Sequence, residues 1–121
     1  MDALLAACAP IGLMIGLVDV ALARSIAVGL PRNRLVGIRL PGLLRSDAAW
    51  DAGHRAAAPV LARTGALALA VTAIGLLACL PLLPDAIRWI GAGLVATGAA
   101  IALGGVAVGS LRAARAARRV P

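Results

Sequence analysis

Three long apolar stretches constrain the fold of this chain more than any other feature of its sequence. They cover residues 3–23, 64–83 and 89–111, and a membrane-spanning helix needs about 20 predominantly apolar residues. Hydrophobic residues make up 62% of the 121 positions, which is more apolar surface than a soluble domain of this size can bury. We therefore expect an all-α fold, a single domain over residues 1–121 with three transmembrane helices.

The first stretch has only part of the pattern of a cleaved signal peptide. Small residues at positions 21–23 would suit cleavage, but Asp2 stands where a signal peptide carries positive charge. We expect this helix to remain in the mature protein.

The positive charge is distributed unevenly along the chain. Arginines gather in and around the first connection and in the tail at 112–121, whereas the second connection holds only Arg88. The positive-inside rule then predicts a multi-pass membrane protein with its N-terminus outside and its first connection and tail cytoplasmic. Membrane topology and lipid headgroups account for the arginines, so we expect membrane lipids as partners and no direct nucleic-acid binding.

The first helix carries an acid where acids are rare. Gly12, Gly16 and Asp19 share roughly one face, and glycines four residues apart allow a neighbouring helix to approach closely. A carboxylate in a membrane helix marks a candidate functional site. Alternatively, Asp19 lies near the cytoplasmic interface and merely pairs with an arginine such as Arg24.

Among the arginines, Arg39 is the partner that we predict for Asp19. Arg24 follows Asp19 by five residues, about 140° around the helix, whereas a folded-back loop could carry Arg39 beneath the bundle. We expect an Asp19–Arg39 contact, direct or through one water, with Trp50 sealing it from solvent.

The connection at 31–58 is predicted to be an ordered loop followed by a short amphipathic helix. Prolines and glycines punctuate the loop, and its apolar residues indicate that it folds back onto the helices or headgroups. Ser46 suits the N-cap of the following helix, in which Asp51 and Arg55 can pair and Trp50 suits the membrane interface. Pro59 either begins the second membrane helix or lies within one long helix that starts at Ser46.

No residue pattern for conventional catalysis is present. The single histidine and two separated cysteines do not make a metal site, and no Ser-His-Asp or Cys-His arrangement can be argued. We expect no enzyme activity, cofactor or metal, and we interpret Cys8 and Cys79 as small hydrophobic residues.

The polar residues of the connection form a pattern found in one family. Asn33, Gly37-Ile38-Arg39, Pro41, Arg45-Ser46-Asp47, Trp50 and His54-Arg55 resemble the signature of the SdpI family of small bacterial membrane proteins. In that family the signature lies between the first two helices of a three-helix unit. Leu40 and Leu43 depart from it, because hydroxyl residues, usually threonine, are expected there.

The resemblance implies a protein of the bacterial plasma (inner) membrane with a role in toxin immunity or membrane signalling. The founding member of the family confers immunity against a secreted killing toxin and draws a transcriptional repressor to the membrane. By this hypothesis the chain binds a peptide toxin, a lipid or a cytoplasmic regulator. The candidate binding residues are Asp19, Asn33, Gly37, Arg39, Trp50 and His54. The alternative is a small transporter subunit with Asp19 as its coupling acid, in which glycine-rich helix faces join several copies.

Overall fold

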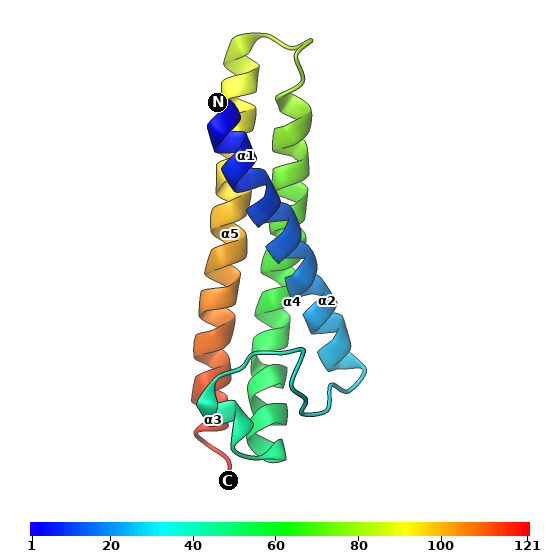
Figure 1. The fold of residues 1–121 in the computed structure, drawn as a ribbon, viewed down its shortest axis with the longest axis vertical. Helices are drawn as coiled ribbons and strands as arrows, with labels where there is room; N and C mark the ends of the chain where they lie inside the picture. Colours follow the sequence, from blue (N-terminus) through cyan, green and yellow to red (C-terminus); the bar gives the residue numbers. More distant parts are fainter.

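The computed structural model describes residues 1–121 as three long helical rods that run side by side (Figure 1). The first rod contains α1 (Asp2–Pro10), a π-helical turn η1 (Ile11–Ile15) and α2 (Gly16–Ala27). The second is α4 (Asp47–Ala78), the third is α5 (Asp85–Ala117), and a short α3 (Pro41–Leu44) lies in the first connection. Each of the 3 rods is long and apolar enough to cross a membrane. The prediction of an all-α fold with three such helices is confirmed.

The amphipathic segment and the second membrane stretch form one continuous helix rather than two. Pro59 lies inside α4, so the interpretation as one long helix is the correct one. Ser46 caps it as expected, since its Oγ accepts a hydrogen bond from the Ala49 N–H at 3.0 Å. At the other end α4 stops at Ala78, short of the expected residue 83, because the prolines at 81 and 84 cannot continue a helix.

The third helix is longer at both ends than the expected span of 89–111. It begins at Asp85, directly after Pro84, and continues through the first half of the basic tail, because alanine and arginine are strong helix formers. Its 33 residues measure about 50 Å, against a hydrocarbon core of about 30 Å. The arginine-bearing end therefore extends beyond the apolar part of the bundle.

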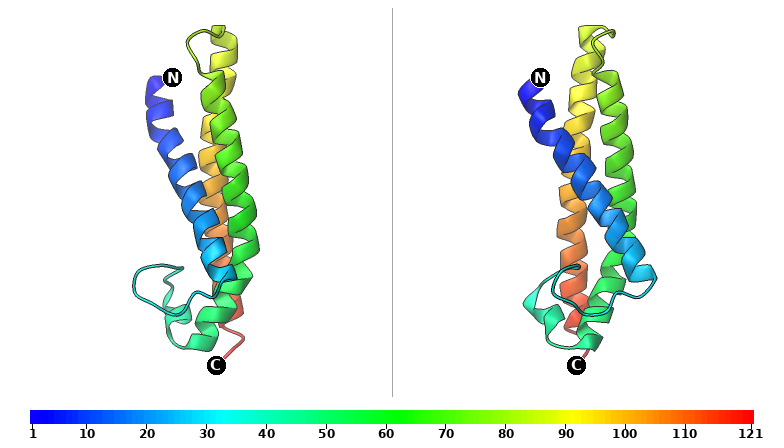
Figure 2. Two further views of the ribbon diagram at one scale, coloured as in Figure 1. Left: turned by 90° about the vertical axis from the view of Figure 1, so that its right-hand side faces the viewer. Right: turned by 45° about the vertical axis from the view of Figure 1, so that its right-hand side comes forward.

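Small residues let the helices approach closely. A Cβ added to Gly75 would lie 2.7 Å from the Gly91 carbonyl oxygen, and one added to Gly65 would lie 2.7 Å from that of Gly16. The first rod leans across the pair formed by α4 and α5 (Figure 2). Small residues every three or four positions on α5 are buried, Gly105 and Gly109 among them, whereas the row of Ala96, Ala100 and Gly104 is partly or fully exposed.

The first connection and the chain's C-terminal residues meet at one end of the bundle, which we call the loop end (Figures 1 and 2). The Arg45 guanidinium donates to the carbonyls of Ala117 and Val120. The Ser46 hydroxyl donates to the Pro121 carbonyl at 2.6 Å. These contacts fasten the connection to the last turn of α5.

Candidate functional site

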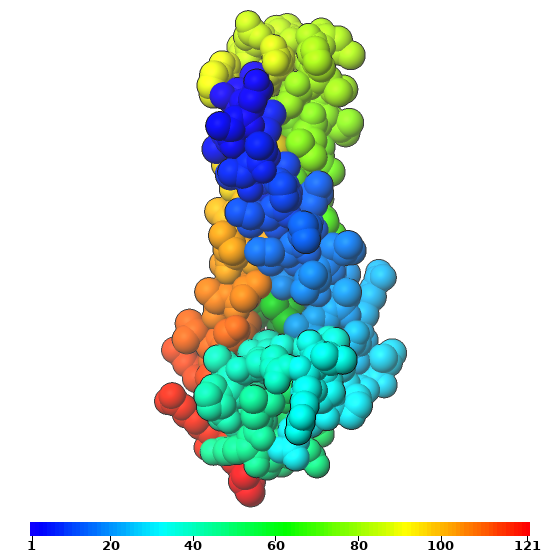
Figure 3. All heavy atoms as spheres, in the orientation of Figure 1, coloured from blue at the N-terminus to red at the C-terminus, as the bar shows by residue number.

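The first connection crosses in front of the helices at the loop end (Figure 3). Asn33 forms its first turn. The Asn33 Oδ1 accepts from the N–H groups of Leu35 and Val36, both at 2.8 Å. Its Nδ2 donates to the Pro31 carbonyl at 2.9 Å. An asparagine bonded to the following backbone in this way forms an Asx turn, so Asn33 shapes the loop.

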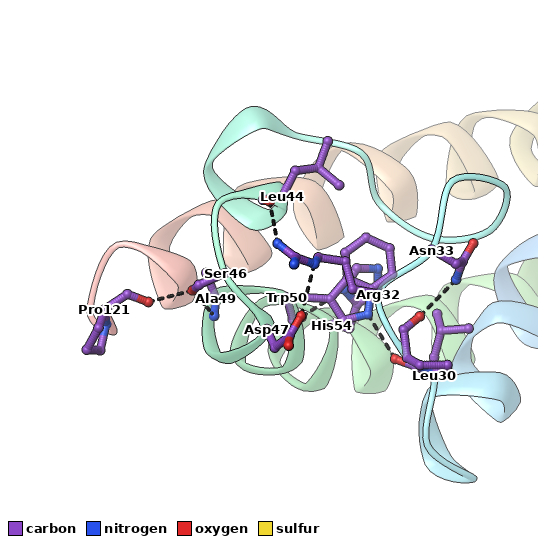
Figure 4. Close-up of polar contacts among 11 residues, drawn as sticks. Leu30, Arg32, Asn33, Leu44, Ser46, Asp47, Ala49, Trp50, His54 and Pro121 are labelled. Atoms are coloured by element: carbon purple, nitrogen blue, oxygen red, sulfur yellow. Dashed lines mark hydrogen bonds and ion pairs between the residues drawn. The ribbon is translucent and has the colours of Figure 1, made fainter.

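Arg32 ties the loop to the two helices that follow it (Figure 4). Its Nη1 donates to the Leu44 carbonyl at 2.8 Å, and its Nε lies 2.9 Å from Asp47 Oδ1. No sequence pattern predicts this ion pair, because its partners lie fifteen residues apart across an irregular loop. The expected pairing of Asp51 with Arg55 is wrong, since the only two ion pairs are Arg32–Asp47 and Arg88–Asp85.

Trp50 lies inside the protein rather than against lipid. Its side chain is fully buried, and its Nε1 donates to the Leu30 carbonyl at 2.8 Å (Figure 4). Its ring centroid lies 4.0 Å from that of His54. Trp50 therefore fixes the chain just after the first rod to α4, and its place at the depth of the membrane interface stays a prediction.

His54 joins the loop to α4 through both ring nitrogens. Its Nε2 accepts from the Ile38 N–H at 2.9 Å, and its Nδ1 lies 2.9 Å from the Trp50 carbonyl oxygen. Because Nε2 is an acceptor, the geometry assigns the proton to Nδ1 and makes the ring neutral. His54 precedes the apolar stretch of α4, and burial lowers its pKa, against opposing contributions from the Trp50 hydrogen bond and the Asp51 charge.

Gly37 lets the loop lie directly on these two rings. Its φ is +122°, and an added Cβ would lie 2.6 Å from His54 Nε2 and 2.7 Å from the Trp50 ring. Only glycine fits this combination of left-handed backbone and close approach. Of the six candidate residues, Gly37, Trp50 and His54 thus form one loop-anchoring cluster, while Asn33 shapes the turn that precedes it.

The other two candidates, Asp19 and Arg39, line a cavity between the loop and all three rods. Its volume is about 310 Å³. A hollow is visible between the loop, α2 and α5 (Figure 3). Apart from Gly37, the remaining lining is mostly apolar: Val18, Leu22, Ile38, Leu40, Leu61, Val106 and Ser110. Sequence reasoning missed the α4 and α5 residues, because nothing in their types distinguishes them from other packing residues.

Asp19 enters this cavity without a partner. Its side chain is 3% exposed, its buried Oδ2 has no hydrogen-bond partner, and neither ion pair involves it. Arg39 is an exposed residue that also lines a second, basic hollow with Arg32, Asn33 and Arg34. The predicted direct Asp19–Arg39 contact is therefore wrong, and Trp50 is not among the residues that line the cavity.

The two leucines at the expected hydroxyl positions are packing residues. Leu43 is fully buried against Gly53, where an added Cβ would lie 2.8 Å from its Cγ and Cδ2. Leu40 is partly buried and lines the cavity. In this chain the polar groups of the cavity come instead from Asp19, Arg39 and Ser110.

These features define a small multi-pass membrane protein whose helix bundle is covered at one end by an ordered loop. No group of three or more His, Cys, Asp or Glu side chains is placed to hold a metal ion. The chain belongs to the SdpI/YfhL protein family, whose family model matches residues 29–111. The match covers the loop-anchoring cluster, α4 and most of α5, while Asp19 precedes it. No curated protein and no solved structure shows significant similarity to the chain.

Proposed function

We propose that this protein acts in toxin immunity or membrane signalling by binding a partner in the cavity beneath its loop. It does so without catalysis, as a protein of the plasma membrane whose loop end faces the cytoplasm. The observation that carries the proposal is the buried Asp19 carboxylate, which reaches the cavity with no protein partner. A buried polar group that is left unsatisfied is costly, which is expected where a ligand supplies the missing contact.

The loop-anchoring cluster supports this proposal because it holds the cavity wall in place. Gly37 is itself a lining residue, and His54 fixes the neighbouring Ile38 through its backbone N–H. A preorganised wall binds with less loss of conformational freedom than a mobile one. The family signature then serves to build the site, and Arg39 is the signature residue at this cavity whose side chain is exposed for contact with a partner.

A toxin challenge tests the proposal. A sensitive bacterium expressing the chain is exposed to culture fluid from toxin-secreting strains, and survival is compared with membrane abundance. We expect Arg39→Ala to lower survival at normal abundance, while Arg34→Ala, which removes an exposed arginine outside the Asp19 cavity, retains protection. Equal survival with and without the chain would contradict the immunity role.

The unpartnered acid also favours a second candidate, a subunit of a small transporter that uses Asp19 as its coupling acid. Three helices are few to enclose a pathway, so this role requires several copies. The exposed small residues Gly93 and Gly104 on α5 have open space at their Cα atoms and could admit another helix. A strictly monomeric protein in lipid nanodiscs would contradict the transporter role and leave the binding role intact.

A further inference from the structure

The cavity beneath the loop is selective in its chemistry, and Asp19 sets that selectivity. The α2 backbone packs closely on α4 here, since a Cβ added to Gly65 would lie 2.9 Å from the Asp19 Cβ. The Asp19 side chain therefore leaves α2 directly at this helix interface, and its Oδ2 is buried without a partner. A buried carboxylate is stable as an ion only when a cation or hydrogen-bond donors compensate it.

The lining argues against a metal ion as that cation. Hard cations take six or more oxygen ligands in their preferred geometries, and the cavity offers only Asp19 and the Ser110 hydroxyl among its side-chain oxygens. The other walls are formed mainly by aliphatic side chains. Such a site suits a ligand that brings its own N–H donors on an apolar body.

From this arrangement we infer that the cavity binds a lipophilic organic cation, a protonated amine or guanidinium group carried on an apolar chain. The inference rests on the proposed function and names the ligand class of the same site. The cationic head donates hydrogen bonds to Asp19, and its chain lies against the aliphatic wall that includes Val18, Leu22 and Val106. Arg39 lines the same cavity, but its side chain is exposed and water and salt screen its charge, so it does not compensate the buried carboxylate.

The position of Asp19 fits a ligand that enters from the membrane. Asp19 lies eight residues before Ala27, the end of α2, which is about 12 Å along the helix. Val18 and Leu17, its neighbours, are 60% and 62% exposed. Beside the carboxylate the rod thus presents an apolar surface along which a hydrocarbon chain can lie.

Binding of n-octylammonium to the full chain in phosphatidylcholine nanodiscs tests the inference, with the rise in unfolding temperature as the readout. We expect a saturable rise for the unchanged chain and for Asp2→Asn, which removes an exposed acid elsewhere. Asp19→Asn, which keeps the side-chain shape, should bind at least about tenfold more weakly, as expected on losing a charged hydrogen bond. Val106→Phe narrows the cavity without touching Asp19 and should also weaken binding.

Matched probes identify the features that are recognised. Octanol, which lacks the charge, and methylammonium, which lacks the chain, should each give no saturable shift. Competition with octylammonium by phosphatidylethanolamine would assign the site to a lipid amine, and competition by an apolar peptide with one lysine would assign it to a peptide. Equal binding of octylammonium to Asp19→Asn, equal binding of octanol, or no saturable binding at all would overturn the inference.

Different results would contradict the proposed function and the inferred ligand class. If Arg39 and Asp19 are needed for survival but octylammonium does not bind, the site stands and the ligand class is wrong. If octylammonium binds through Asp19 but neither residue affects survival, the ligand class stands and the proposed function is wrong.

Discussion

The backbone N–H of Ile38 donates to His54 Nε2 over 2.9 Å, joining the middle of the loop to a residue sixteen positions further along the chain. Ile38 lines the Asp19 cavity, so this hydrogen bond holds one of the cavity's walls. A protonated His54 could not accept it, because both ring nitrogens would then carry protons.

Acidification is therefore expected to destabilise the loop. Burial lowers the pKa of His54 from its ordinary 6.5. At pH values between this lowered pKa and 6.5, the unfolded state therefore binds more protons than the folded state. The free energy of unfolding then decreases as pH falls below about 6.5, toward the folded pKa. Thermal unfolding in nanodiscs at about pH 7.5 and pH 5 measures this. His54→Gln should remove the pH-dependent part, and an unchanged pH dependence in that variant would contradict the assignment.

Gly37→Ala should destabilise the protein by about 1–3 kcal/mol, the usual cost of placing a side chain in a left-handed backbone region. The new Cβ would also meet His54 Nε2 and the Trp50 ring. Gly42→Ala is the matched control, since an added Cβ there has nothing within 4 Å. The comparison uses unfolding temperature and proteolysis of the loop. Equal stability of the two variants would show that the loop does not lie on these rings.

The two tryptophans should report opposite environments. Trp50 is fully buried, whereas Trp89 is 58% exposed on the surface of α5. In Trp89→Phe, the remaining Trp50 fluorescence should resist quenching by brominated lipids and by aqueous acrylamide. In Trp50→Phe, the remaining Trp89 should be quenched by one of them. Strong quenching of Trp50 would mean that its ring faces lipid or water.

The topology expected from the arginines can be read from single cysteines. In a background of Cys8→Ala and Cys79→Ala, Leu35→Cys and Leu82→Cys provide reporters at positions that are 90% and 80% exposed. A membrane-impermeant thiol reagent added to intact cells should label position 82 and reach position 35 only after permeabilisation. The reverse pattern would invert the orientation.

Much of the fold could be predicted because length and hydrophobicity alone are enough to identify membrane helices. The Ser46 cap and the close approach at Gly16 also followed from local sequence rules. The continuity of α4 through Pro59 did not, since a proline can begin a helix or lie within one, and only packing decides between the two. The helix α5 continues beyond the expected residue 111 because alanine and arginine are strong helix formers. The charge of the tail predicts a membrane anchor but not a helix.

For the candidate site, the sequence pattern indicates which residues to consider but not how they are arranged. Trp50 and His54 both belong to the family signature, yet their partners, Leu30 and Ile38, offer only backbone groups that no sequence pattern marks. From the sequence, Arg39 is predicted to reach Asp19. Instead, the backbone N–H of the neighbouring Ile38 donates to His54, and the Arg39 side chain is exposed. Loop geometry of this kind is fixed by many long-range contacts at once.

Survival of a toxin-challenged bacterium expressing Asp19→Asn tests the central claim, that the unpartnered carboxylate beneath the loop is where this protein binds its partner. Asparagine keeps the size of the side chain and removes its charge, and Asp2→Asn controls for the loss of an acid. At equal membrane abundance, we predict that Asp19→Asn reduces survival to that of cells lacking the chain, while Asp2→Asn protects fully. Full protection by Asp19→Asn would contradict the claim.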